Sequence, residues 1–142
     1  MAAQVQYIDH VGIVVENADA SAKALSDMLG VHIVHDEVID AVGVRLVYLA
    51  ASDAPEGATV QLVQPVAPGP IRDFLASHGE GPHHVCFCVD QIADFLCRPA
   101  ESETKIFTGG RGRQACFLAA RPAGLQVELI EMGARAALSE RG

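Results

Sequence analysis

Tryptophan is absent from this 142-residue chain, aromatic residues make up only 5% of it, and Lys and Arg number 10 against 18 acidic residues. Half of the residues are hydrophobic, which is enough for a packed core and argues against disorder. That core must consist mainly of Val, Leu, Ile and Ala. The net charge of -8 disfavours nucleic acid and anionic membrane surfaces as partners, because both attract basic protein surfaces.

Long hydrophobic runs are also lacking, and none approaches the roughly 20 residues of a membrane span. Residues 1–4 do not have the basic and apolar segments of a secretion signal. The four cysteines include no second pair at zinc-site spacing, and Cys86 and Cys88 alternate on a strand-like run. This pattern favours small buried thiols in a reducing cytoplasm. We therefore expect a cytoplasmic protein that forms a single domain over residues 1–142.

What the sequence does contain is an internal repeat. Residues 8–15 and 82–89 are short apolar segments that carry a histidine at the third position, His10 and His84. Residues 61–64 and 128–131 each place two aliphatic residues between polar ones, and they begin with Gln61 and Glu128. In both copies the histidine precedes the Gln or Glu residue, by 51 positions in the first copy and by 44 in the second. The chain is therefore predicted to contain two copies of one module.

Each module is predicted to have the order β-α-β-β-β from its hydrophobic periodicity and turn residues. After the opening strand, the first module has a helix over 18–29 and strands over 31–38, 44–50 and 59–63, and the second has a helix near 91–96 and strands over 103–108, 114–119 and 125–130. The predicted boundaries are 8–65 for the first module, 66–82 for a connector with a helix over 71–78, 83–131 for the second module and 132–142 for a tail. The expected fold is α+β, with the two modules forming a curved mixed sheet around a metal cleft.

The repeated positions predict the metal site. Gln61 and Glu128 are polar residues within aliphatic strands, and a buried carboxylate without a partner is costly. Two imidazoles and two oxygen donors suit one divalent ion that keeps an open position, such as Co, Mn, Ni, Zn or Mg. The predicted metal ligands are His10, Gln61, His84 and Glu128.

Alignment of the two histidine strands selects His84 over its neighbour His83 as the ligand. Gln64 and Glu131 lie three residues beyond the predicted oxygen ligands, so strand alternation should turn them away from the site. The remaining histidines match nothing in the other module and are predicted to lie on the surface; they are His32, His35 and His78.

Four segments resemble the vicinal oxygen chelate superfamily, which includes glyoxalase I and the extradiol dioxygenases, and within it they are most similar to methylmalonyl-CoA epimerases. They are IDHVGI at 8–13, QLVQP at 61–65, GEGPHHV at 79–85 and GLQVEL at 124–129. The resemblance implies a small acyl thioester substrate whose carbonyl chelates the metal, a base that removes the α-hydrogen, and a homodimer. Short apolar strands with edges that need covering also favour a dimer.

The chain departs from this family at the expected base. Epimerases of the family usually carry a glutamate two residues before the Gly-Val that opens the third strand, but here Ala41 and Val42 precede Gly43. The remaining candidates for the base are Glu128, which would also be a ligand, and Asp40, if the turn before Gly43 is bent. The resemblance thus implies an epimerase-like or isomerase-like metal enzyme. A metal-dependent lyase, a decarboxylation-type enolate reaction and a glyoxalase-like lyase are alternatives, whereas a ligand-sequestering protein would not need four metal ligands.

Overall fold

The computed structural model describes residues 3–51 and 57–132. The chain divides into two compact units: the first comprises residues 10–84, and the second comprises residues 1–9 together with 85–142. Strands β1 (Val5–Val14) and β5 (Gly81–Val89) each contribute to both units.

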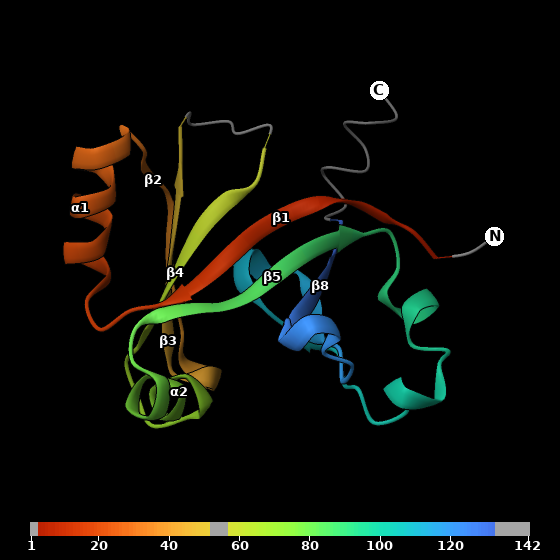
Figure 1. Ribbon diagram of the computed structural model, residues 1–142. Helices are drawn as coiled ribbons and strands as arrows, with labels where there is room; N and C mark the ends of the chain where they lie inside the picture. The colour runs from red at the N-terminus through yellow and green to blue at the C-terminus, as the bar shows by residue number, and fades with distance from the viewer. Residues whose placement is uncertain (1–2, 52–56, 133–142) are drawn as a thin grey trace. The chain divides into compact units, whose positions relative to one another are not determined.

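The first unit contains most of the first module and the connector (Figure 1). Its strand order is β2-β3-β4-β1-β5, in which β1 pairs with β4 in parallel and β3 pairs with β2 and β4 in antiparallel orientation. Its other elements are α1 (Ala18–Leu29), β2 (His32–Ile39), a 3-10 helix at Asp40–Val42, β3 (Val44–Ala50), β4 (Thr59–Pro65) and α2 (Pro70–His78).

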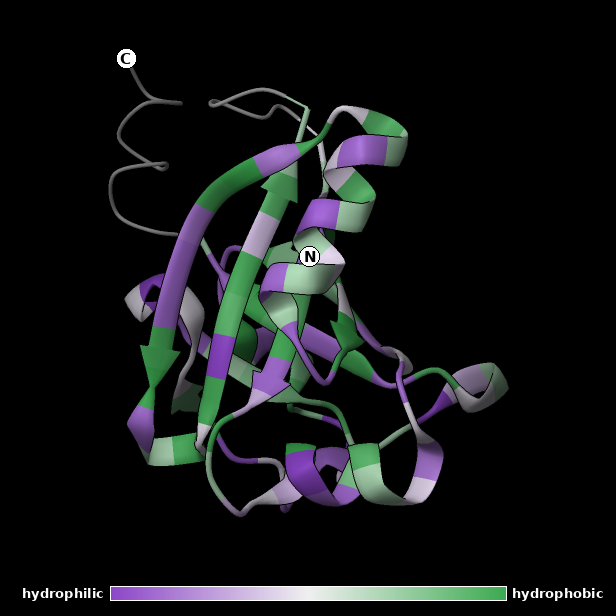
Figure 2. Cartoon of the chain, turned by 90° about the vertical axis from the view of Figure 1, so that its left-hand side faces the viewer, coloured by the Kyte–Doolittle hydropathy of each residue, from purple (hydrophilic) through white to green (hydrophobic). Residues whose placement is uncertain are grey.

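Helix α1 begins and ends at residues suited to those positions. The side chain of Asn17 accepts a hydrogen bond from the backbone N–H of Ala20 at the N-terminus, and Gly30 adopts a left-handed conformation at the C-terminus. Figure 2 looks at the side on which α1 lies and shows hydrophobic and hydrophilic bands alternating along it. The helix covers one face of the sheet, where Ala18 and Ala22 pack with Val47 and Leu49.

Helix α2 packs against the opposite face of the sheet. Successive strand residues point to opposite sides, and the β3 residues that pack near α2 alternate with those that pack against α1. Its residues Ile71, Phe74 and Leu75 contact a buried cluster on this face that includes Tyr48 and Val63. The cluster contains Val14, Val44, Leu46, Tyr48 and Val63. The face covered by α2 is also the one that carries the first unit's predicted ligands.

The second unit has the strand order β1-β5-β8-β7-β6, in which β5 and β8 are parallel and β7 pairs with β6 and β8 in antiparallel orientation. After β5, it consists of 3-10 helices at Ile92–Phe95, Pro99–Glu101, Gly110–Gly112 and Pro122–Gly124 and the strands β6 (Phe107–Thr108), β7 (Gln114–Phe117) and β8 (Val127–Glu131). Its core lies on the two faces of β5 and β8, and includes Cys86, Cys88 and Cys116. None of the helices in the described residues is long and apolar enough to span a membrane.

The structure confirms the α+β class and the mixed sheet. The second module departs from the predicted pattern, because the helix expected near 91–96 is a single 3-10 turn. Pro99 follows closely and disfavours a helical conformation at Arg98, so the segment cannot extend. The strand expected over 103–108 begins only at Phe107, since the Thr104 hydroxyl is held in a turn by the carboxylate of Glu101.

Candidate metal centre

The two parallel strand pairs repeat the same register. In the first, β1 residue Gly12, two positions after His10, lies opposite Gln61 of β4. In the second, β5 residue Cys86, two positions after His84, lies opposite Glu128 of β8. Each predicted oxygen ligand therefore has the same strand position relative to its histidine, as expected from the internal repeat.

His10 and His84 are brought together in the first unit. Both are buried, and their Nε2 atoms lie 3.1 Å apart. Metal–imidazole bonds measure about 2.0–2.1 Å, so adjacent nitrogen ligands of one ion lie roughly 2.8–3.4 Å from each other in octahedral or tetrahedral geometry. The observed separation fits two imidazoles that bind the same ion.

Gly12 provides the space for the His84 ring. A Cβ atom at Gly12 would lie 2.1 Å from Cε1 and 2.4 Å from Nε2 of His84, far inside the carbon–carbon contact distance of about 3.5–4.0 Å. Gly12 lies in the predicted opening strand, but no role in the site was predicted for it. The signal was present, because Gly is the one residue that allows another side chain to lie directly on a strand backbone.

Gln61 lies beside this pair, on the same face of the sheet. It is 4% exposed, and its Nε2 donates a hydrogen bond of 2.9 Å to the hydroxyl of Tyr48. The Tyr48 ring in turn makes an edge contact with the His10 ring, at 5.8 Å between centroids. Tyr48 is a second residue of the site that was not predicted from the sequence, because a tyrosine within an apolar strand is typical of a hydrophobic core.

His35 differs from its predicted place on the surface, and His83, which was not predicted to be a ligand, contacts His84. The Nδ1 atom of His83 lies 2.8 Å from Nδ1 of His84, and its ring makes an edge contact with Phe74 of α2. His35 is half-buried, lies 2.5 Å from the Glu37 carboxylate and tilts against the Tyr48 ring. Both histidines therefore contact a residue of the candidate centre rather than only solvent.

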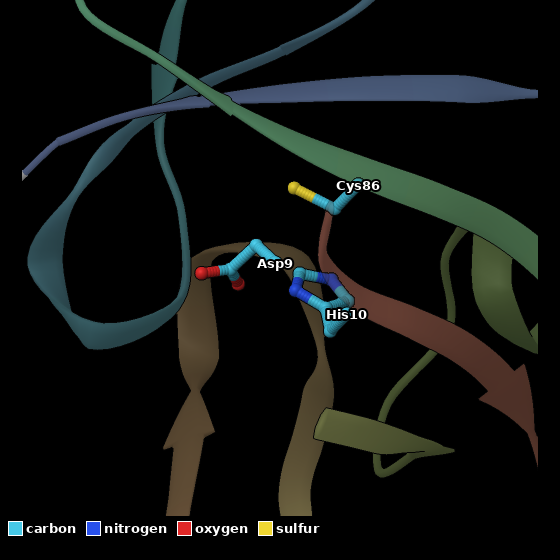
Figure 3. A group of neighbouring side chains, drawn as sticks. All are labelled: Asp9, His10 and Cys86. Carbon is cyan, nitrogen blue, oxygen red and sulfur yellow. The ribbon is translucent and has the colours of Figure 1, made fainter. Parts of the chain in front are cut away.

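Glu128 belongs to the second unit, where it is 8% exposed on β8. The Cys86 thiol donates a hydrogen bond to its carboxylate, and burial together with the charges of Glu128 and Asp9 raises the pKa of Cys86 well above its usual range. Cys86 is thus held as a neutral thiol. It is buried as predicted, as are Cys88 and Cys116, whereas Cys97 is exposed. Figure 3 shows Asp9 and Cys86 close together, on β1 and β5.

Asp9 precedes His10 on β1 and connects this strand to a distant loop. Its buried carboxylate forms ion pairs with Arg111 and with Arg113, the latter at 3.6 Å. Arg111 has a left-handed backbone at φ 60°, and Arg113 also donates to the carbonyl oxygen of Glu131 at 2.8 Å. The pair fixes the loop at 109–113 to the strand that carries the first predicted ligand.

The predicted alternate base, Asp40, is exposed in the 3-10 helix at Asp40–Val42. The helix ends at Gly43, which has a left-handed backbone at φ 68°. The turn before β3 is therefore bent, and Ala41 and Val42 in this turn are exposed as well.

Gln64 and Glu131 have parallel structural roles away from the candidate ligands. The Gln64 side chain accepts a hydrogen bond from the backbone N–H of Ala18, at the start of α1. The Glu131 carboxylate accepts one from the backbone N–H of Ile92, at the start of the 3-10 helix that replaces the second helix. The repeat thus includes an N-terminal cap in each module, which satisfies otherwise unpaired backbone donors.

Comparison with known proteins adds to this geometry. The model of the glyoxalase/bleomycin resistance protein/dioxygenase superfamily matches residues 9–117. The uncharacterized protein YqjC of Bacillus subtilis (strain 168) is 24% identical over 131 residues, which cover 87% of this chain and 91% of that protein.

Two solved structures are similar over nearly the whole chain. Methylmalonyl-CoA epimerase from Mycobacterium tuberculosis is 25% identical with a TM-score of 0.80, covering 97% of this chain and 95% of the other. A variant of Streptomyces coelicolor methylmalonyl-CoA epimerase in complex with 2-nitronate-propionyl-CoA is 26% identical with a TM-score of 0.79, covering 92% and 100%.

Proposed function

Since the chain belongs to the glyoxalase/bleomycin resistance protein/dioxygenase superfamily, we propose that it is a metal-dependent, epimerase-like or isomerase-like enzyme acting on an acyl thioester. The observation that carries this proposal is the buried pair of His10 and His84, whose Nε2 atoms lie 3.1 Å apart above the Cβ-less Gly12. Two imidazoles held this closely in a folded core are suited to a shared cation.

The proposed ligands are His10, Gln61, His84 and Glu128, and the proposed cofactor is one divalent ion, Co, Mn, Ni, Zn or Mg. The shared register of the two strand pairs supports the inclusion of Gln61 and Glu128. A mixed nitrogen and oxygen set leaves coordination positions for a substrate. An ion bound by these residues would polarise a thioester carbonyl and stabilise the charge of an enolate.

The similar structures support the proposed substrate class. One of them is a methylmalonyl-CoA epimerase in complex with methylmalonyl-CoA and NH4+, with a TM-score of 0.79 and 26% identity to this chain. An acyl thioester is therefore the proposed substrate here. Ala41, however, occupies the place where the family resemblance implies a glutamate that acts as the base. Glu128 is the proposed base, and Asp40 in the bent turn is the second candidate.

A metal-dependent lyase, including a glyoxalase-like one, is the second candidate function, because the same ligands also support enolate chemistry that requires a single base. The exposed turn at Asp40–Val42, without a glutamate, favours this alternative. A ligand-sequestering protein would give the buried histidine pair no function. We also propose a homodimer in the cytoplasm, and the four free thiols are consistent with a reducing compartment.

The test combines metal analysis with exchange of the α-proton. Purified protein is saturated with Co²⁺, dialysed and analysed for metal, and it is then mixed with methylmalonyl-CoA and other acyl-CoA esters in deuterated buffer, where exchange is followed by NMR. We expect about one ion per chain, and exchange that is lost in His84→Ala. Exchange in the wild type with neither inversion nor bond cleavage would contradict both named reaction types, and a metal-free wild type would contradict the centre itself.

A further inference from the structure

Gln61 presents a problem of orientation for any metal site that uses it. Its side-chain amide offers two atoms of similar size, but only the oxygen is a metal ligand, because the nitrogen lone pair is delocalised. The two atoms can exchange places by rotation of the amide. We propose that Tyr48 is the positioning residue that selects the oxygen, an inference that rests on the proposed role of Gln61 as a ligand.

The strand register brings the two side chains together. Tyr48 of β3 lies directly opposite Gln61 of β4 in an antiparallel pair, so their side chains share one face of the sheet. The amide Nε2 donates to the Tyr48 hydroxyl oxygen at 2.9 Å. With the nitrogen held in this way, the amide oxygen on the other branch points away from Tyr48.

The tyrosine is itself held rigidly. It is 2% exposed and belongs to the buried cluster that packs under α2. Its ring meets the His10 ring edge-on at 5.8 Å and the His35 ring at 5.6 Å. A hydroxyl fixed on two sides by ring contacts provides a stationary acceptor for the amide nitrogen.

Without the hydroxyl, the orientation that turns the oxygen towards the ion would leave the amide NH₂ group buried and without that acceptor. Burial of an unsatisfied donor is unfavourable, so rotated forms of Gln61 would become more populated. Outer residues that orient metal ligands typically contribute 10–100-fold to metal affinity. A loss of the Tyr48 hydroxyl should therefore weaken metal binding even though Tyr48 does not touch the ion.

The experiment is a double-mutant cycle of Tyr48→Phe and Gln61→Ala, with Co²⁺ affinity measured by calorimetry on metal-free protein. Phenylalanine keeps the ring contacts and removes only the hydroxyl. We expect Tyr48→Phe to weaken Co²⁺ binding about tenfold in the wild-type background and to have no effect in the Gln61→Ala background. The visible spectrum of the Co²⁺ complex should change in Tyr48→Phe in the direction seen for Gln61→Ala.

Tyr7→Phe is the matched control, because Tyr7 is the only other tyrosine in the chain and is exposed on β1. If Gln61→Ala binds Co²⁺ like the wild type, the proposed role of Gln61 as a ligand is wrong and this inference falls with it. If Gln61→Ala weakens binding but Tyr48→Phe does not, the ligand set stands and only the inference is overturned. An equal effect of Tyr48→Phe in both backgrounds also overturns it.

A second pair keeps the test decisive if Tyr48→Phe perturbs folding. In Gln61→Glu both terminal atoms are oxygens, so the orientation no longer matters. Tyr48→Phe should then cost no affinity in the Gln61→Glu background, whereas a folding defect would persist there. Thermal unfolding of the metal-free wild type, Tyr48→Phe, Gln61→Glu and the double variant measures that defect directly.

Discussion

At the scale of single residues, the space above Gly12 decides whether His84 can take the position seen here. We expect Gly12→Ala to displace the His84 ring, because a Cβ atom would lie 2.1 Å from its Cε1. Loss of one positioned ligand should lower Co²⁺ affinity by on the order of 100-fold, as measured by calorimetry. Gly57→Ala is the control, since a Cβ there meets nothing within 4 Å. Unchanged affinity in Gly12→Ala would show that His84 does not bind the ion.

His83 should act on the metal through its neighbour. A His84 that binds an ion through Nε2 carries its proton on Nδ1, and the Nδ1 of His83 lies 2.8 Å away as an acceptor. His83→Phe should therefore weaken Co²⁺ binding roughly tenfold in the same titration. His78→Phe keeps a ring stacked on Phe74 but is not in this contact, so it should bind like the wild type. Equal affinities in both variants would remove His83 from the site.

Substitution of Ala41 tests whether the absence of a glutamate at this position limits epimerisation. It lies in the exposed 3-10 turn before Gly43, where the family resemblance implies a glutamate. We expect slow methylmalonyl-CoA epimerisation by the wild type and an increase in Ala41→Glu, since a positioned acid–base group typically contributes about 10²–10⁴-fold. Inversion is followed by NMR, with Ala41→Gln as the control that has the same size without the charge. Rapid epimerisation by the unmodified protein would show that another residue already supplies the proton.

At the scale of secondary structure elements, hydrophobic periodicity was sufficient wherever local signals agreed. Helix α1 occupies the predicted range, with Asn17 and Gly30 as caps, and β3 likewise matches. The second module was predicted less well, because its turns depend on distant partners. The segment near Glu101 is shaped by hydrogen bonds to residues 18 and 19 positions later in the chain, which no local window of sequence can show.

The contacts of Tyr48 and His83 had the same limitation. The repeat predicted four candidate ligands from matched positions, and it correctly placed His10 near His84. The groups that surround these ligands occur once each, so comparison of the modules could not find them. Gln64 and Glu131 were correctly predicted to face away, but their capping roles depend on three-dimensional contacts.

Glu101 connects a 3-10 helix to the segment after β7. Its buried carboxylate accepts hydrogen bonds from the backbone N–H groups of Ala119 and Ala120 and from the Thr104 hydroxyl. The Ala119 N–H first, and then the hydroxyl, lower the pKa of Glu101 below its usual value. A carboxyl whose pKa is lower in the folded than in the unfolded protein stabilises the fold at pH values above its unfolded pKa. This contribution is lost as the pH falls through the folded pKa.

We therefore expect Glu101→Gln to reduce the free energy of unfolding at pH 7 by about 1–3 kcal/mol and to make stability less sensitive to acid. Urea unfolding at a series of pH values between neutrality and strong acid measures both effects. Glu103→Gln, at an exposed position two residues later, should leave the curve unchanged. A variant at Glu101 that keeps the wild-type dependence on pH would show that these hydrogen bonds contribute no charge-dependent stability.

At the scale of the whole molecule, the repeat places a buried polar side chain on each of the strands β1, β4, β5 and β8. His10, Gln61, His84 and Glu128 are at most 8% exposed. Burial of polar side chains is costly unless they have partners, and the proposed cation would be a shared partner for the imidazoles of His10 and His84. Metal binding should therefore contribute to folding as well as to chemistry.

This leads to a prediction about stability. A ligand that binds only the folded state at 100 times its Kd adds about 2.7 kcal/mol, which for a chain of 142 residues corresponds to a rise in Tm of roughly 10 °C. We expect the Tm to rise by this amount on addition of Co²⁺ at that excess and to return on addition of a chelator, as measured by differential scanning calorimetry. His84→Ala should lose the rise because one imidazole of the pair is gone, whereas His32→Ala, which removes a histidine outside the predicted ligand set, should retain it. A rise of equal size in His84→Ala would mean that the stabilising ion binds elsewhere on the chain.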